Sequence, residues 1–219
     1  MAKPQSTFRN MLTALFGVTF IASAILGLVF DLTKGPIAKA ELNKQTSAVA
    51  AVLPEFNFLG TAYKLLPADG IDSIEVFPAF DADSTIIACA IKSYTNKGFS
   101  GDIEIMVGID NEGLISGYQV LKHAETPGLG SKMNEWFSNT EKASQNIIGR
   151  NISDKELRVS KDGGDVDAIT AATISSRAFL DAINRANNTV NNQYSNGNSS
   201  ATKKNDKAKT KSDNNSQEK

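Results

Sequence analysis

Residues 167–176 read DAITAATISS, and this stretch decides how the chain is interpreted. Small and hydroxyl residues gather here immediately before a segment whose apolar residues recur at three- and four-residue steps. These apolar residues are Phe179, Ile183, Ala186 and Val190. The spacing predicts a helix with one apolar face. Thr173 and Ser175 are candidate N-caps of that helix, because a side-chain oxygen accepts a hydrogen bond from an otherwise unpaired first-turn amide.

A helix start of this kind has two interpretations. The remaining free amides and the positive end of the helix dipole favour an anion such as phosphate, and Ala171 and Ala172 are small enough to let a ligand approach the backbone. The alternative is an ordinary capped helix start, which describes most clusters of Ser and Thr. The local residues alone leave both interpretations open.

A long apolar segment lies near the amino terminus. Residues 11–30 contain no charged side chain, and as a helix they would extend about 30 Å, the thickness of a bilayer's hydrocarbon core. A cleaved signal peptide is the alternative, but its apolar core is usually shorter, and residues 31–36, DLTKGP, form a poor cleavage site. We therefore expect a transmembrane helix at 11–30 after a flank at 1–10. Lysines on both sides leave its orientation nearly undecided.

Two further segments flank the globular part of the chain. Residues 31–60 are expected to form a linker that includes a helix over 37–53, which Pro54 stops. Residues 195–219 are rich in Asn, Ser and Lys and contain only two apolar residues, which predicts a disordered tail. The tail carries six Lys against two Asp and one Glu, whereas the whole chain has a net charge of −1. A solvated extension explains it more simply than a lipid-binding or partner-binding arm.

One globular domain is expected at residues 61–194. Residues 103–109 alternate apolar side chains on one face, and a turn leads to a second strand at 114–121, so this region predicts a β-hairpin. Residues 131–139 and 141–148 are interpreted as short helices. Strands in hairpins with helices set apart indicate an α+β domain, with antiparallel strands and flanking helices.

Several kinds of site are not expected. Cys89 lies in an apolar strand-like run and, as the single cysteine, is interpreted as a core residue. The turn at 110–113 lacks the alternating oxygen ligands of a calcium loop, and no metal site is predicted. The sequence shows no dinucleotide fingerprint and no cysteine-rich cluster motif, so we expect neither an NAD site nor an iron–sulfur cluster.

Three motifs occur in a recognisable order. Residues 98–103 read GFSGDI, residues 122–130 read KHAETPGLG, and residues 167–173 read DAITAAT. In this order they resemble the FMN-binding domains found in the G subunit of Rnf electron-transport complexes and in the C subunit of the sodium-translocating NADH:quinone reductase. The resemblance covers residues 95–180, and the apolar segment extends it toward the amino terminus. In that family the last threonine of the third motif is joined to FMN through a phosphoester, which implies attachment at Thr173.

The resemblance also implies which residues surround the cofactor. First-turn amides and nearby hydroxyls would hold the phosphate, the second motif would supply a pocket for the flavin ring, and a lysine would set charge near the reduced flavin. Without the resemblance, the second motif is a tight connection and the lysine is a surface residue in a turn. The implied cofactor-binding residues are Thr170, Ala172, Ser175, Ser176, Glu125, Thr126, Leu129, Gly130, Gly98 and Lys161, with Phe99 and Ser100 as weaker candidates.

Two features bear on how FMN would be attached. A threonine hydroxyl is a poor nucleophile without a base, and His123, the only histidine, is distant in sequence and is interpreted as structural. The resemblance therefore implies a separate flavin transferase, which uses FAD and a magnesium ion. Ala171 departs from the family pattern, which usually has glycine at this position, and its methyl group could alter how the transferase grips the loop.

These observations together predict a membrane-anchored flavoprotein subunit of an Rnf-type complex. Its covalent FMN would relay electrons while the complex moves sodium ions or protons, so the chain would be a redox subunit of a translocase without a complete catalytic site of its own. Other subunits, the transferase and membrane lipid are the expected partners, and nucleic acid is not. The resemblance implies a single-pass protein of the bacterial inner membrane with its soluble domain on the periplasmic or extracytoplasmic side.

Alternative functions remain open at this point. One is the equivalent subunit of the sodium-translocating quinone reductase, although the short chain favours the Rnf-type complex. Another is a membrane-anchored scaffold without a cofactor, in which the Thr/Ser turn only caps a helix. A flavin reductase that acts alone is a third, but no nicotinamide site is visible in the sequence.

Overall fold

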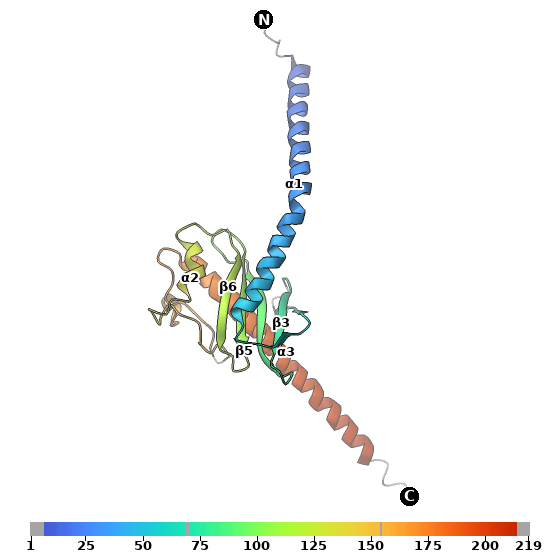
Figure 1. Ribbon diagram of the computed structural model, residues 1–219, viewed down its shortest axis with the longest axis vertical. Coiled ribbons are helices and arrows are strands. Elements are labelled where there is room, and N and C mark those ends of the chain that lie inside the picture. The colour runs from blue at the N-terminus through green and yellow to red at the C-terminus, as the bar shows by residue number, and fades with distance from the viewer. Residues whose placement is uncertain (1–6, 69–70, 154, 214–219) are drawn as a thin grey trace. The chain divides into compact units, whose positions relative to one another are not determined.

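The computed structural model describes residues 7–68, 71–153 and 155–213 (Figure 1). The chain divides into two units, Met1–Thr46 and Ser47–Lys219. The helices are α1 (Phe8–Val52), α2 (Met133–Trp136) and α3 (Thr173–Asp213), with short 3-10 helices η1 (Gly130–Lys132) and η2 (Ser160–Asp162). The strands are β1 (Phe58–Leu59), β2 (Tyr63–Leu65), β3 (Ile74–Phe80), β4 (Ile86–Thr95), β5 (Ile103–Asp110) and β6 (Ile115–Lys122).

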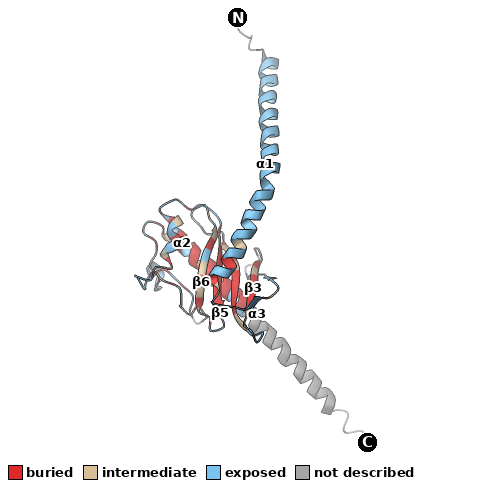
Figure 2. Ribbon diagram, in the orientation of Figure 1, coloured by how far each residue is buried: buried red, intermediate tan, exposed pale blue. Residues whose placement is uncertain are grey.

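The first unit is the amino-terminal part of α1, and its side chains are exposed along nearly the whole segment (Figure 2). Among the described residues, α1 is the one helix that is long and apolar enough to cross a membrane. Its threonine hydroxyls donate to carbonyls one turn earlier, as Thr19 Oγ1 does to Leu15 O at 2.9 Å. Such bonds satisfy polar groups inside the helix, which an apolar solvent would not do.

The helix α1 is longer than the sequence predicts. A membrane segment at 11–30 and a separate helix at 37–53 were expected, whereas one helix runs through Pro36 to Val52. Proline removes one amide donor and strains the preceding turn, but the helix continues on both sides of it. The predicted end of the second segment is confirmed, because α1 stops two residues before Pro54.

The second unit is built on a six-stranded antiparallel sheet. The strand order is β1-β3-β4-β5-β6, and β2 also pairs with β3. The predicted hairpin is confirmed in β5 and β6, and its turn is held by Asp110, whose Oδ1 accepts hydrogen bonds from the amides of Glu112 and Leu114 at 2.9 and 2.8 Å. Gly113 has a φ of +79°, which a side chain would disfavour. The α+β prediction is therefore confirmed.

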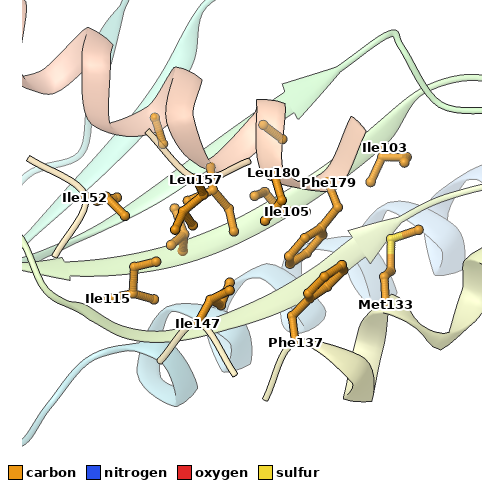
Figure 3. Packing of buried hydrophobic residues seen from close by; sticks show 14 of the residues in the cluster. Ile103, Ile105, Ile115, Met133, Phe137, Ile147, Ile152, Leu157, Phe179 and Leu180 are labelled. Carbon is orange, nitrogen blue, oxygen red and sulfur yellow. The ribbon is translucent and has the colours of Figure 1, made fainter. Parts of the chain in front are cut away.

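The main core lies between one face of the sheet and α3, which contacts β4 and β5 (Figure 1). The apolar face predicted from Phe179, Ile183, Ala186 and Val190 is buried there. Phe179 stacks on Phe137 with ring centroids 4.6 Å apart (Figure 3), and the ring of Tyr118 meets Phe179 edge-on. Burial raises the pKa of Tyr118 to about 12, so its hydroxyl stays neutral and donates to Met133 O. Phe137 is thus part of the core, and the half-buried Trp136 packs against it.

A smaller core covers the other face of the sheet. Ala48, Val49 and Val52 at the end of α1 pack with Ala90 of β4 and Met106 of β5. The approach is close because Gly108 has no side chain, and a Cβ there would clash with Val52 O. Cys89 on β4 is buried in the main core, as the sequence predicts.

The prediction of a helix at 141–148 is wrong, and the helix predicted at 131–139 is reduced to η1 and α2. Residues 141–148 form a series of turns. The reason is that their backbone groups bond to other segments: Ile147 N donates to Phe137 O, and Ser144 O accepts from Asp167 N. These tertiary hydrogen bonds compete with the i to i−4 bonds that a helix needs.

The carboxyl-terminal segment also differs from the prediction. A disordered tail was expected from residue 195, whereas α3 continues to Asp213. The segment has no proline, and each residue added to an existing helix gains a backbone hydrogen bond without a new nucleation step. The last six residues of the expected tail, 214–219, lie outside the described residues.

Candidate flavin pocket at the start of helix α3

The three sequence motifs meet at one pocket of about 320 Å³. The first motif contributes from the loop after β4, the second from the loop after β6, and the third from the first turn of α3 and the residues before it. The wall is mostly apolar, with hydroxyl groups at its helix end. The lining residues are Phe99, Glu125, Thr126, Leu129, Gly130, Ala171, Ala172, Thr173, Ile174 and Ser175.

The first turn of α3 presents backbone amides at this pocket. The first backbone bond of this turn is donated by Ser176 N to Ala172 O at 3.0 Å. The amides of Thr173, Ile174 and Ser175 precede it and belong to the group that an α-helix leaves without intrahelical acceptors. Together with the helix dipole, they favour an anion at this end of the pocket.

A tight turn immediately precedes α3. Ala172 N donates to Ile169 O, and Ala171 between them has a φ of +61°, in the left-handed region that favours glycine. The departure from the usual glycine at this position therefore falls on a backbone conformation that strains an alanine. The hydroxyl of Ser176 supports the turn from inside, because it accepts from Ile169 N and donates to Ala172 O.

Thr173 is half-buried at the opening of the pocket. Its Oγ1 lies 3.4 Å from Nζ of the exposed Lys161, which approaches from η2. The next residue of η2, Asp162, forms a two-pronged pair with Arg177 one turn into α3, with both distances at 2.7 Å. Hydrogen bonds from Arg177 hold the pKa of Asp162 below its usual value. This pair fixes η2 beside α3, so that Lys161 is kept near the threonine.

Glu125 occupies the inner wall of the pocket and is only 4% exposed. Its Oε2 accepts a hydrogen bond from Ser175 Oγ at 2.5 Å, and its Oε1 accepts one from Ser100 N at 3.0 Å. Ser175 was predicted as a possible helix cap, but its hydroxyl donates to Glu125 instead. The carboxylate therefore contacts residues of both other segments of the pocket.

The loop after Glu125 is a compact turn that leaves one apolar side chain outside. Thr126 O accepts from the amides of Leu129 and Ser131, and Ser131 Oγ accepts from Gly128 N. Leu129 remains 39% exposed, beside Phe99 at 67% and Ile174 at 48%. Exposed apolar side chains on three sides of the pocket are suited to contact a planar aromatic group.

Asp167, the first residue of the third motif, lies behind the pocket and joins neighbouring loops. Its carboxylate accepts hydrogen bonds from Ser144 Oγ at 2.6 Å and Ser160 Oγ at 2.9 Å, and its carbonyl accepts from Trp136 Nε1. The two serine hydrogen bonds hold the pKa of Asp167 below its usual value. Its role in the structure is to brace the turn that leads to Thr173.

The structure brings together most of the residues that the sequence singled out. The predicted residues on the pocket wall are Thr173, Ala172, Ser175, Glu125, Thr126, Leu129 and Gly130. The others lie around it: Gly98 is packed behind Glu125, Ser176 is in the core, Lys161 approaches Thr173 from outside, and Thr170 is exposed in the preceding turn.

Phe99, Ala171 and Ile174 form more of the pocket wall than the sequence indicates. Two of them had weak signals: Phe99 is flanked by Gly98 and a serine in a polar loop, and Ile174 is an apolar residue off the buried stripe of α3. Ala171 had been noted for its small size. His123, expected to be structural, accepts a hydrogen bond from Glu125 N through Nδ1 at 3.2 Å.

Comparison with known proteins places this geometry in a family. The family model of the FMN-binding domain matches residues 98–188, which include the whole pocket wall. The G subunit of the ion-translocating oxidoreductase complex of Aliivibrio fischeri (strain ATCC 700601 / ES114) is 32% identical over 81% of this chain and 86% of its own length. The chain belongs to the family of G subunits of ion-translocating oxidoreductase complexes.

Other members of this family show similar relationships. The G subunits of Shewanella amazonensis and Salmonella typhi are 33% and 35% identical, over 78% and 75% of this chain, and 82% of each relative is covered. Among solved structures, Shewanella oneidensis NqrC is 26% identical, and the likeness covers 51% of this chain and 54% of NqrC with a TM-score of 0.41.

Proposed function

We propose that this chain is a membrane-anchored flavoprotein subunit of an ion-translocating oxidoreductase complex, with FMN attached to Thr173 through a phosphoester. The observation that carries the proposal is the position of the Thr173 hydroxyl, at the pocket opening and beside the first-turn amides of α3. The family assignment and the match to an FMN-binding domain support the cofactor.

The residues present fit both ends of FMN. The phosphate end would meet the amides of Thr173, Ile174 and Ser175, and the Lys161 ammonium lies close enough to pair with the remaining negative charge. The ring would contact the exposed apolar side chains of Leu129, Ile174 and Phe99. Bound FMN would supply one- and two-electron redox chemistry, whereas the protein supplies attachment, orientation and charge.

Attachment would require an external enzyme. Thr173 Oγ1 would form a bond to the FMN phosphorus of FAD, the pyrophosphate bond would break, AMP would leave, and the hydroxyl proton would pass to a base of the transferase. The side chain described beside Thr173 Oγ1 is Lys161, which donates rather than accepts a proton there. A base from the transferase is therefore needed to activate the hydroxyl.

A covalent flavin on an anchored domain is suited to an electron relay. The apolar part of α1 is long enough to hold the chain in a bilayer, and the phosphoester prevents loss of the cofactor to a compartment where it cannot be replaced. The other subunits of the complex would supply the electron donor and acceptor and the path of the ion. We place the domain on the extracytoplasmic side, with α1 crossing the membrane once.

Intact mass spectrometry tests the attachment. The full chain co-expressed with its flavin transferase should gain one FMN-sized mass increment, and Thr173→Ala should abolish it. Thr173→Ser keeps a hydroxyl and should keep the increment, and the exposed Thr140→Ala serves as the matched control. An increment that survives in Thr173→Ala would place the bond elsewhere, and its absence from the wild-type chain would favour a scaffold without a cofactor.

Reporter fusions test the orientation. Alkaline phosphatase fused after residue 213 should be active, because that enzyme needs an oxidising compartment, and a fluorescent protein that folds only in the cytoplasm should be dark at the same position. The opposite pair of results would put the domain in the cytoplasm.

A further inference from the structure

We propose that Glu125 is a positioning residue that ties the three segments of the pocket together and places a fixed negative charge beside the flavin. The charge would favour the oxidised flavin over its reduced, more negative forms. The inference about the charge rests on the function proposed above, whereas the inference about the tie concerns the chain alone.

The tie follows from the hydrogen bonds of the carboxylate. Ser175 Oγ reaches Oε2 from α3, and Ser100 N reaches Oε1 from the loop after β4. Ser175 is distant in sequence from Glu125, so neither local propensity nor a turn brings the two together. One side chain thus joins the segments that carry Phe99, Leu129 and Thr173 at the pocket itself.

The space around Glu125 is closed on two sides by glycine. A Cβ at Gly130 would lie 2.6 Å from Ser175 Oγ and 2.7 Å from Glu125 Oε2, and a Cβ at Gly98 would lie 2.7 Å from Glu125 Oε1. Real Cβ atoms do not approach other atoms so closely. Gly130 therefore leaves room for the carboxylate and its serine partner, and Gly98 leaves room for the carboxylate and for Gly101 O, with which a Cβ would clash.

The charge of Glu125 is not neutralised by a cation. Within the described part of the chain, no Lys, Arg or His side chain forms an ion pair with it. Its 2.5 Å contact with Ser175 is in the range of hydrogen bonds that a hydroxyl donates to an ionised carboxylate. A charge in such a buried position is poorly screened, so it acts on nearby groups more strongly than a surface charge does.

The expected consequence is a lower midpoint potential of the attached flavin. Reduction adds negative charge to the ring, and a fixed negative charge on the pocket wall opposes it. Lys161 at the opening acts in the opposite direction, but it is exposed and its charge is screened by solvent. The buried carboxylate therefore has the larger influence of the two.

The tie is tested on the protein without FMN. In Glu125→Ala, amide hydrogen exchange at Ser100 should accelerate by at least about tenfold relative to amides in the middle of β5, because the Ser100 amide loses its acceptor. Ser175→Ala removes one donor, leaves the carboxylate in place, and should leave the Ser100 amide protected. Unchanged exchange at Ser100 in a folded Glu125→Ala would overturn the tie. If that variant does not fold, unchanged protection in Ser175→Ala of the Ser176 amide, which donates the first backbone bond of α3 to Ala172 O, overturns it.

The charge is tested by spectroelectrochemical titration of the protein with FMN attached. Glu125→Gln keeps the size and hydrogen-bonding capacity of the side chain, and its midpoint potential should shift upward, with the equilibrium constant for reduction changing on the order of tenfold. Glu112→Gln, at an exposed carboxylate in the β5–β6 turn, is the matched control and should not shift. An equal potential in Glu125→Gln and wild type would overturn the charge effect.

The two tests separate this inference from the proposed function. If wild-type protein never receives FMN, the proposed function fails. The exchange measurement at Ser100 still tests whether Glu125 joins the three segments of the pocket. If a folded Glu125→Ala receives no FMN while Glu125→Gln and the wild type do, the positioning role is supported, because Thr173 itself is unchanged. If FMN is attached in both and the potentials agree, only the charge effect is wrong.

Discussion

The two sides of the pocket differ in how firmly they are held. On the inner side, Glu125, Ser175 and Gly130 are buried and leave one another almost no space. On the outer side, Thr173 is half-buried, Ala171 and Lys161 are exposed, and one contact of 3.4 Å links the lysine to the threonine. The inner side is thus packed as closely as a protein core, whereas the side chains of the outer side are exposed to solvent.

This difference suits a site that is modified by another enzyme. Under the proposed function, the transferase would have to reach the threonine, which an exposed outer side allows. The inner side would then hold the flavin ring in one orientation for electron transfer.

Replacement of the core residue behind the inner side should have the largest effect on stability. Phe179 is fully buried on α3 and stacks on Phe137. Phe179→Ala removes the ring and leaves a cavity, so we expect a loss of about 3–5 kcal/mol in the free energy of unfolding, measured in urea. Phe99→Ala, on the 67% exposed ring of the outer side, should change it by less than about 0.5 kcal/mol. Equal losses would contradict the distinction between the two sides.

Acid should weaken the brace behind the pocket. The pKa of Asp167 is lowered in the folded protein by hydrogen bonds from Ser144 and Ser160, so the unfolded chain binds the proton more readily. The stabilisation is therefore complete above the unfolded value, near about pH 4, and is lost as the pH falls through the lower folded pKa. Melting temperatures between about pH 2 and 5 should fall less steeply in Asp167→Asn than in wild type. Asp83→Asn is the control and should follow the wild-type curve.

Loss of the cation at the outer side should slow attachment moderately. Lys161 lies beside Thr173 but is exposed, and exposed ion pairs contribute about 0.2–1 kcal/mol. Lys161→Gln should therefore reduce the rate of FMN attachment by no more than about fivefold, measured by intact mass over time. Lys161→Arg should restore most of the rate, and the exposed Lys155→Gln should leave it unchanged. A complete loss in Lys161→Gln would mean that the lysine takes part in the chemistry.

The smallest effect is expected at the strained turn. Ala171 has a φ of +61°, which costs an alanine about 1–2 kcal/mol, whereas glycine gives back about 0.4–1 kcal/mol through its freedom in the unfolded chain. Ala171→Gly should therefore stabilise the folded protein by up to about 1 kcal/mol, measured in urea. Ala124→Gly, in a loop without a positive φ, should destabilise it slightly. Changes of the same sign in both variants would show that strain at Ala171 is not the cause.

The spacing of apolar residues along the sequence correctly predicted the helices and strands that depend mainly on their own neighbouring residues. The apolar segment of α1, the β5–β6 hairpin and the buried stripe of α3 each repeat at the spacing of the structure that they form. The helix that was wrongly predicted at 141–148 shows where such patterns stop being informative. Residues 141–148 have a helical pattern, but their backbone is bonded to Phe137 and Asp167, and sequence periodicity contains no information about such partners.

In the candidate site, too, local features were predicted from the sequence and long-range contacts were not. Thr173 and the loop that carries Leu129 were proposed from the resemblance of the motifs to a known family, and the helix that begins at Thr173 was predicted from its local pattern. The sequence did not predict the burial of Glu125 or its bond to Ser175, because these two residues lie far apart in the chain. Lys161 was a candidate, but its contact with Thr173 was seen only in the structure.

The sequence by itself determined that an apolar helix precedes an α+β domain, and that three motifs occur in a known order. Only the tertiary structure decided that these motifs share one pocket, that one of its walls is tightly packed, and that the threonine lies at its opening. The physical reason is that periodicity and turn chemistry act over a few residues. Packing and buried hydrogen bonds, by contrast, act between segments that only the folded chain brings together.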